Sequence, residues 1–202
     1  ARRPGSDETA PVADAQIDFD SWWDYDHPDL SEARFRSLLP ELPFDSPIRL
    51  ELLTQIARAQ GLQRLYDDAH KTLDEVEARL PAGSTRILAR YLLERGRIFN
   101  SSKKPDNARP LFERALAVAG AADQDGLAVD AAHMLAIVAT DDAALEWNLH
   151  ALALAERSAQ PAAKRWLGSL LNNIGWTYHD SGRLEEALNA FEKAAAWRRE
   201  NG

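Results

Sequence analysis

The residues of this chain that could do chemistry are arginines, asparagines, histidines and one tryptophan. The candidate site residues are Arg58, Arg90, Arg97, Asn100, His133, Asn172, Asn173, Trp176 and His179. Arginine presents a planar fork of N–H donors that matches a carboxylate, and asparagine can hold both the N–H and the C=O of an extended peptide. Together these residue types suit the binding of an acidic peptide.

Two histidine and aspartate pairs raise the question of catalysis or metal binding. Asp130 precedes His133 by three residues, and Asp180 follows His179 directly. No two histidines have the spacing of a metal motif on one helix face, and no serine or cysteine stands in a recognisable nucleophile motif. We therefore predict no enzyme, no metal and no cofactor. The alternative is a small-ligand or metal-dependent hydrolytic site around Asp130, His133, Asn172 and His179.

Composition narrows the class of protein. The chain has 202 residues, 45% of them hydrophobic, a net charge of −8 and no cysteine. An acidic chain is a poor nucleic-acid binder, and no apolar run is long enough to span a membrane. Nothing resembles a secretory leader, so we predict a cytoplasmic location. The excess of arginine over lysine indicates a GC-rich, bacterial genome.

The elements that must position the candidate residues are helices. Apolar residues recur three and four apart, Ala, Leu, Glu and Arg dominate, and β-branched residues are scarce. Chain-breaking residues fall at 80–84, 120–126 and 160–161 and divide the helical region into similar units. We predict an all-α fold with repeat units at about 48–85, 86–125, 126–163 and 164–202.

An internal repeat runs through these units. The last unit reads Leu171-x2-Ile174-Gly175-x2-Tyr178, then Ala187-x3-Phe191-x2-Ala194. The second unit has the same frame, with Leu92, Gly96, Phe99, Ala108, Phe112 and Ala115. Weaker copies complete a column of small residues at Ala57, Gly96, Ala136 and Gly175, spaced by 39, 40 and 39 residues. Such residues are needed where the two helices of a hairpin approach closely.

This motif resembles the tetratricopeptide repeat, a helix-turn-helix unit with its large, small and aromatic residues at the same offsets. The spacing exceeds the usual value of about 34 residues and is similar to that of the extended repeats in kinesin light chain-like proteins. The resemblance implies a right-handed α-solenoid with an N-terminal capping segment. It also implies a non-catalytic protein-interaction module or scaffold that binds a peptide or protein segment in a concave groove.

In the family that the motif resembles, the first helix of each hairpin lines the groove. The column after the small residue then contains Arg58, Arg97, Ile137 and Trp176. The column three residues before the small residue contains Thr54, Leu93, His133 and Asn172. The column six residues before it contains Glu51, Arg90, Asp130 and Ser169. Asn100 and His179 follow the small residue by four. The arginines favour acidic partner segments, unless they are merely solvated and neutralised by Glu51 and Glu94.

The N-terminal region is expected to divide into two parts. Residues 1–16 read as a disordered leader, and residues 17–47 as an acidic aromatic segment followed by a capping helix from Ser31 to Leu39. Between Asp7 and Asp29 there are eight carboxylates and no Lys or Arg, with Trp22, Trp23 and Tyr25 among them. Residues 17–29 either cap the first hairpin or occupy the arginine-lined groove.

The C-terminal hairpin raises the possibility of self-association. Its second helix carries Leu188, Ala195 and Trp197, and only Gly202 and its neighbours follow it. A solenoid needs a polar terminal cap, because its last hairpin otherwise exposes an apolar flank. Either the chain is part of a longer protein, or a partner or a second copy covers that flank, giving a homodimer.

Overall fold

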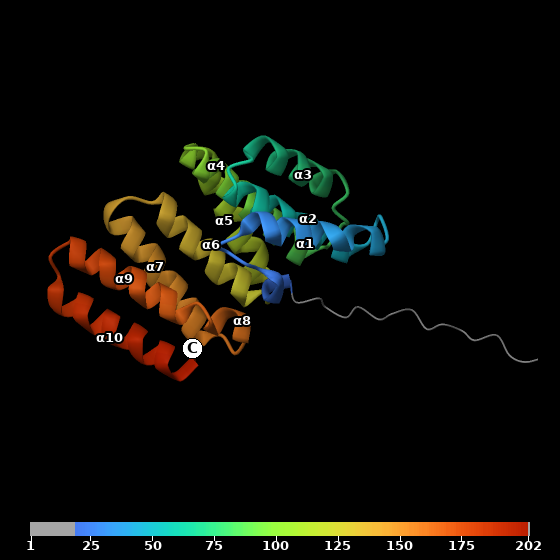
Figure 1. Ribbon diagram of the computed structural model, residues 1–202. Coiled ribbons are helices and arrows are strands. Elements are labelled where there is room, and N and C mark those ends of the chain that lie inside the picture. The colour runs from blue at the N-terminus through green and yellow to red at the C-terminus, as the bar shows by residue number, and fades with distance from the viewer. Residues whose placement is uncertain (1–18, 202) are drawn as a thin grey trace, which may run out of the picture.

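The computed structural model describes residues 19–201, and every regular element within them is a helix (Figure 1). In chain order the elements are η1 (Phe19–Trp22), α1 (Pro28–Leu38), η2 (Leu39–Glu41), α2 (Pro47–Leu62), α3 (Tyr66–Ala78), α4 (Thr85–Ser101), α5 (Pro105–Ala121), α6 (Asp125–Val138), α7 (Asp141–Arg157), α8 (Pro161–Lys164), α9 (Leu167–Asp180) and α10 (Leu184–Asn201). The predicted all-α fold is confirmed. The leader predicted for residues 1–16 lies outside the described residues.

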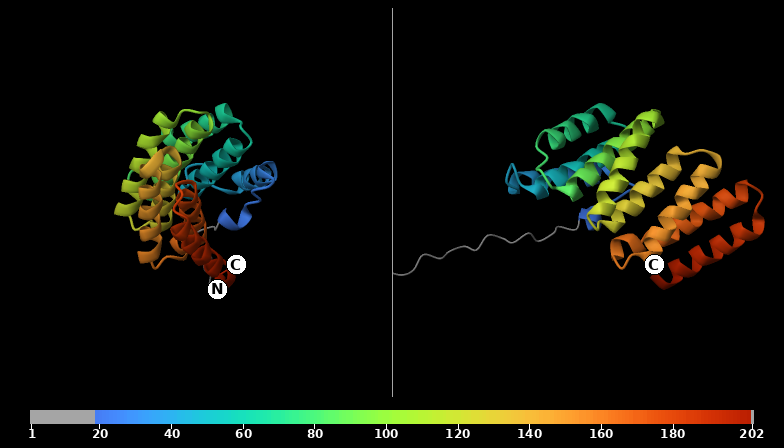
Figure 2. Two further views of the ribbon diagram at one scale, coloured as in Figure 1. Left: turned by 90° about the vertical axis from the view of Figure 1, so that its left-hand side faces the viewer. Right: turned by 180° about the vertical axis from the view of Figure 1, so that it is seen from behind.

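The long helices pair as consecutive hairpins, α2 with α3, α4 with α5, α6 with α7, and α9 with α10. Figure 2 shows these hairpins side by side in chain order. Neighbouring hairpins stack through α2 and α4, then mainly through α5 and α6, and at the C-terminal end through α7 and α9. This arrangement is a helical repeat solenoid, in which each unit buries its apolar face against the next.

The column of small residues lies where the helices of a hairpin approach most closely. Ala57 and Ala136 are buried, and the two glycines face aromatic rings. A Cβ placed on Gly175 would lie 2.6 Å from the ring of Phe191, and one on Gly96 would overlap the ring of Phe112. The predicted reason for small residues at these positions is therefore confirmed.

The capping helix begins earlier than predicted. The helix was predicted to start at Ser31, but α1 starts at Pro28, and Ser31 is buried inside the helix. Its hydroxyl accepts a hydrogen bond from the backbone N–H of Asp24 (2.8 Å) and donates one to the carbonyl of Asp24 (3.0 Å). Pro28 is favourable at the first turn because its missing N–H has no partner there. Ser31 therefore ties the preceding segment to α1.

The segment before α1 packs against the first hairpin. Phe19 is buried, and its ring meets Phe35 of α1 edge to face. The ring of Trp23 also meets Phe35, and its Nε1–H donates to Oε1 of Gln55 on α2 (2.9 Å). These contacts cover part of the first repeat helix, α2, with aromatic side chains.

The short helix α8 interrupts the regular alternation between the third and fourth hairpins. It contacts α6 and α7, and the segment before it is held by Ser158, whose hydroxyl donates to Oδ2 of Asp125 (2.5 Å). A Cβ on Gly126 would lie 2.9 Å from the Cβ of Ala162, so glycine permits this close approach. As a result, α8 lies beside the beginning of α6.

The C-terminal hairpin differs in part from the expectation. Trp197 lies within the hairpin and not on an uncovered flank, because its ring packs over Gly168 of α9. Leu184 and Leu188 of α10 are exposed, 62% and 59% respectively. Among the described residues, no helix is both long and apolar enough to cross a bilayer.

Candidate functional site

The first helices of the hairpins enclose a polar cavity of about 340 Å³. Its lining residues come from α2, α4, α6, the α8 region and the N-terminal segment. They include Arg58, Arg86, Arg90, Arg97 and Arg165, with Glu94, Asp130, Gln55, Gln124, Gln160, Tyr25 and Trp166. A second hollow of about 220 Å³ shares Arg58, Glu94 and Arg97 with this cavity and adds Asn100 and Met134. The two hollows together are called the trough below.

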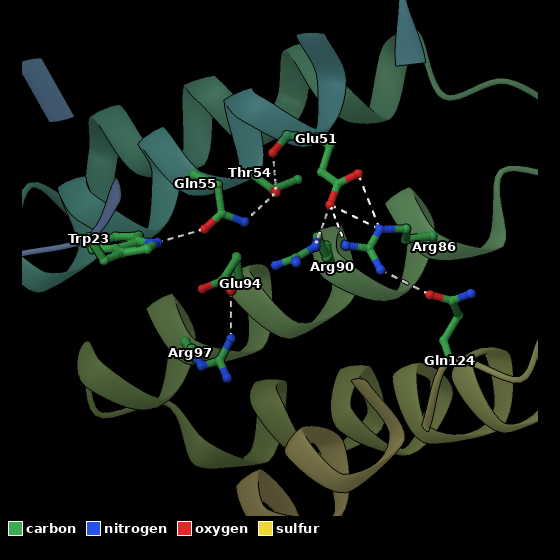
Figure 3. Close-up of polar contacts among 9 residues, drawn as sticks. All are labelled: Trp23, Glu51, Thr54, Gln55, Arg86, Arg90, Glu94, Arg97 and Gln124. Atoms are coloured by element: carbon green, nitrogen blue, oxygen red, sulfur yellow. Dashed lines mark hydrogen bonds and ion pairs between the residues drawn. The ribbon is translucent and has the colours of Figure 1, made fainter. Parts of the chain in front are cut away.

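One end of the trough is organised by Glu51 of α2. Its carboxylate lies 2.9 Å from Nη2 of Arg86 and 2.9 Å from Nε of Arg90, both on α4 (Figure 3). Nη1 of Arg86 also donates to Oε1 of Gln124, the residue before α6 (3.1 Å). One carboxylate thus holds two guanidinium groups, which lie one helical turn apart on α4.

The middle of the trough is an alternating row of charges. Glu94 of α4 accepts from Arg58 of α2 (3.4 Å) and from Arg97 (2.5 Å), and Arg97 also pairs with Asp130 of α6. Burial alone would lower the pKa of Arg97, but Asp130 and Glu94 together raise this pKa above its usual value. Because Glu94 is only 3% exposed, the row links α2, α4 and α6 electrostatically.

Aromatic rings of the N-terminal segment border the trough. Tyr25 stacks on Trp23 with ring centroids 4.9 Å apart and planes 5° apart, and it is 59% exposed. The guanidinium of Arg58 lies 5.8 Å from the centroid of each ring. Trp23 contacts the capping helix α1, as expected for a cap of the first hairpin, whereas Tyr25 lines the trough, as expected for a segment that enters the groove.

The structure brings together only part of the predicted site. Arg58, Arg90, Arg97 and Asn100 line the trough. His133, Asn172, Asn173, Trp176 and His179 lie on α6 and α9 and do not line it. Trp176 is 53% exposed, and its ring lies 5.3 Å from that of Phe191. Ile137, in the same repeat column on α6, is 50% exposed.

One of the predicted groove columns faces the core at its N-terminal end. Thr54 and Leu93 are 0% and 1% exposed, so the expectation that this column lines the groove is wrong for them. The physical reason is that α2 and α4 pack directly against each other, which buries the side of each helix that meets its neighbour. In the same column His133 and Asn172 are half-buried.

The histidines are held by separate local contacts. His133 packs 5.4 Å from the ring of Trp166, its buried Nδ1 has no hydrogen-bond partner among the described residues, and burial lowers its pKa. His179 pairs with its neighbour Asp180 (3.2 Å) at the exposed end of α9. Asp130 is committed to Arg97. Within residues 19–201, no group of three or more histidine and acidic side chains could hold a metal ion.

Several residues that line the trough come from neighbouring repeats and were not among the predicted groove positions. Arg86 and Gln124 lie just outside the predicted groove columns, yet both line the cavity. Arg165 and Trp166 enter it because α8 lies beside the beginning of α6. The excess of arginines near the start of α4 was the only sequence signal for this end of the trough.

Comparisons with known proteins agree with the repeat assignment. The tetratricopeptide repeat family profile matches residues 168–201, which form the last hairpin. A solved structure, that of BtubC (BKLC) from P. vanneervenii, superposes with a TM-score of 0.67 at 17% sequence identity, covering 89% of this chain and 76% of that one. No curated protein matches the sequence. The profile match identifies a tetratricopeptide repeat in the last hairpin, as the repeat motif predicts, and the superposition shows that the two chains share a fold.

Proposed function

We propose that the chain is a protein-interaction scaffold that binds a segment of another protein along the first helices of its hairpins. The observation that supports this most strongly is the charge of the trough. Four arginines of the trough, Arg58, Arg86, Arg90 and Arg97, pair with three carboxylates, Glu51, Glu94 and Asp130, although the whole chain carries a net charge of −8. A local excess of positive charge in a hollow attracts negatively charged groups. The partner segment is therefore biased towards acidic residues.

Exposed apolar side chains extend this surface beyond the trough. Met134 lines the second hollow, and Ile137 lies one helical turn further along the same face of α6. Trp176 occupies the equivalent position on α9. Large aromatic side chains of this kind often supply much of the binding free energy at protein interfaces. An acidic segment with apolar residues would use both parts of the surface.

A selection from a library of random short peptides tests the proposed function. Peptides retained by the chain should be enriched in Asp and Glu, and Trp176→Ala should weaken their binding about tenfold. Leu188→Ala is the matched control, because Leu188 is similarly exposed but lies on α10. The proposal is wrong if no sequence preference emerges, or if both variants weaken binding equally.

Arg58 offers a second test within the trough. Arg58→Gln removes one positive charge and leaves Glu94 paired with Arg97. Acidic peptides should bind more weakly to this variant, as measured by fluorescence anisotropy. Arg183→Gln is the control, since Arg183 forms an exposed pair with Glu186 on α10. Equal affinities for the two variants would argue against binding in the trough.

Self-association is the second candidate, and exposed leucines favour it. Leu184 and Leu188 of α10 are exposed, and Leu149 and Leu152 of α7 border a hollow of about 440 Å³ next to α10. A second copy could bury these side chains. Light scattering on the wild type and on Leu184→Glu tests this, because a dimer should dissociate in the variant. A monomeric wild type at high concentration would exclude it.

A further inference from the structure

The charges at the two parts of the trough are not equally balanced. In the middle, Arg58 and Arg97 face the carboxylates of Glu94 and Asp130, two positive groups with two negative ones. At the end beside the first turn of α6, Arg86 and Arg90 share the single carboxylate of Glu51. This end therefore carries an excess positive charge. Charges removed from water are stable only when they are matched by opposite charges and hydrogen bonds.

The orientation of Arg90 leaves part of its guanidinium group for another partner. Arg90 meets Glu51 through Nε, and its terminal nitrogens are turned away from this carboxylate (Figure 3). Its side chain is only 13% exposed, so water solvates it poorly. The terminal edge of a guanidinium group binds the two oxygens of a carboxylate or phosphate group side by side.

The beginning of α6 lies at the same place; the carboxylate of Asp125 in its first turn accepts from Ser158 and does not line the cavity. Gln124 precedes the helix and is held by Arg86, and Gly126 in the first turn lines the cavity. The first turn of a helix of 14 residues presents N–H groups and a partial positive charge that favour anions. Two arginines and this helix start therefore converge on one end of the cavity.

We propose that this end of the trough is an oxyanion site, in which Arg86, Arg90 and the first turn of α6 hold a carboxylate or phosphate group. The cavity of about 340 Å³ is larger than one such group, so the remainder of a molecule or a peptide side chain fits with it. Where the carboxylate or phosphate group belongs to a bound peptide, the site is part of the proposed binding surface, and the inference rests on the proposed function. A free small anion has the same chemistry and is the other source.

Calorimetric titration with inorganic phosphate and with succinate tests the site directly. Both ions should bind the full chain at constant ionic strength, whereas chloride should not compete. Arg90→Gln should weaken binding about tenfold, because a charge-assisted pair of hydrogen bonds is lost. Arg183→Gln, at the exposed residue just before α10, should bind as the wild type does. Absence of binding, or equal binding by the two variants, would overturn the proposal.

Glu51→Gln provides a test in the opposite direction. This change keeps the shape of the side chain but removes the carboxylate that competes for Arg86 and Arg90, so phosphate should bind about tenfold more tightly. A gain in affinity cannot arise from misfolding, and circular dichroism checks the helicity of each variant. Weaker or unchanged phosphate binding by this variant would contradict the site.

Competition separates the two sources of the oxyanion. If a selected acidic peptide displaces phosphate, the group belongs to the partner segment; if both bind together, the site holds a free anion. Phosphate binding that depends on Arg90, without any peptide binding, would refute the proposed function and leave the site intact. Peptide binding that is insensitive to phosphate, with no measurable anion binding, would refute the site and leave the proposed function intact.

Discussion

At the scale of single residues, glycine at the small-residue positions is explained by an aromatic ring on the facing helix. At Gly175 the space for a Cβ is taken by Phe191 of α10, and at Gly96 by Phe112 of α5. The sequence motif predicts this contact, because small and aromatic residues recur at fixed offsets in both units.

Gly175→Ala should therefore destabilise the protein, although alanine favours helices. We expect a loss of about 1 to 3 kcal/mol in the free energy of unfolding, because the added methyl group displaces the ring. Gly120→Ala is the control: within the described chain no atom lies within 4 Å of a Cβ placed there. That change should be neutral or stabilising by up to about 1 kcal/mol. Urea unfolding measures both, and equal effects would contradict this explanation.

His133 should make stability depend on pH. Burial lowers its pKa in the folded state, with smaller opposing effects from Asp130 and Asn148. The unfolded chain then binds more protons between the folded pKa and the ordinary value of about 6.5, so stability falls as the pH drops below that value. Burial lowers the pKa of His70 as well, which adds to the same trend.

Urea unfolding at pH 7.5 and pH 5.5 measures this effect. The difference in unfolding free energy between the two pH values should be smaller in His133→Gln than in the wild type. His150→Gln, a change at an exposed histidine of α7, serves as the control. A pH dependence identical in His133→Gln and the wild type would show that His133 is not responsible.

The arginines of the trough show the limit of prediction at this scale. Their positions on the first helices follow from the repeat frame, and Arg58, Arg90 and Arg97 were identified from it. Glu51 and Glu94 were named as carboxylates that could neutralise these arginines, and both pair with them. The individual pairs were not predicted, because Glu51 lies 35 residues before Arg86 and Asp130 lies 33 residues after Arg97. Such pairs depend on side-chain positions that a repeat spacing does not specify.

At the scale of elements, helix boundaries follow local signals where proline or a capping serine is present. α2 begins at Pro47, and the hydroxyl of Ser46 accepts from the backbone N–H of Arg49 (3.3 Å). The helix α8 was not predicted, since its four residues, Pro161–Lys164, are too few to show a periodic pattern. Its position beside α6 depends on tertiary contacts such as Ser158 with Asp125.

The N-terminal segment should contribute to stability mainly through Trp23. Trp23→Ala should lower the free energy of unfolding by about 2 to 4 kcal/mol, because it removes the contacts with Phe35 and the hydrogen bond to Gln55. Tyr25→Ala should change stability by less than about 1 kcal/mol, since Tyr25 is mostly exposed. Thermal unfolding compares the two. A larger loss for Tyr25→Ala would contradict the assignment of Trp23 as the capping contact.

At the scale of the whole molecule, charge is distributed unevenly. The chain is acidic overall, whereas the arginines gather on the surface formed by the first helices. Binding of an acidic peptide should therefore weaken as salt rises, by more than the binding of a neutral peptide. Fluorescence anisotropy from 50 mM to 500 mM NaCl measures this. Salt-independent binding would show that the arginines are not involved.

The overall architecture could be predicted from the sequence more completely than the site. A column of small residues in register requires stacked hairpins, and this argument does not depend on any single contact. The site depends on which side chains of adjacent repeats meet, on α8 and on the N-terminal aromatic residues. These features differ from one repeat to the next and leave no periodic signal.

Hydrogen–deuterium exchange with a bound, selected peptide tests the central claim most directly. The account predicts slower exchange in α2, α4, α6 and α9, whose side chains line the trough or present Ile137 and Trp176. The second helices of the hairpins should exchange as they do in the free protein. Protection confined to α3, α5, α7 and α10 would contradict the account.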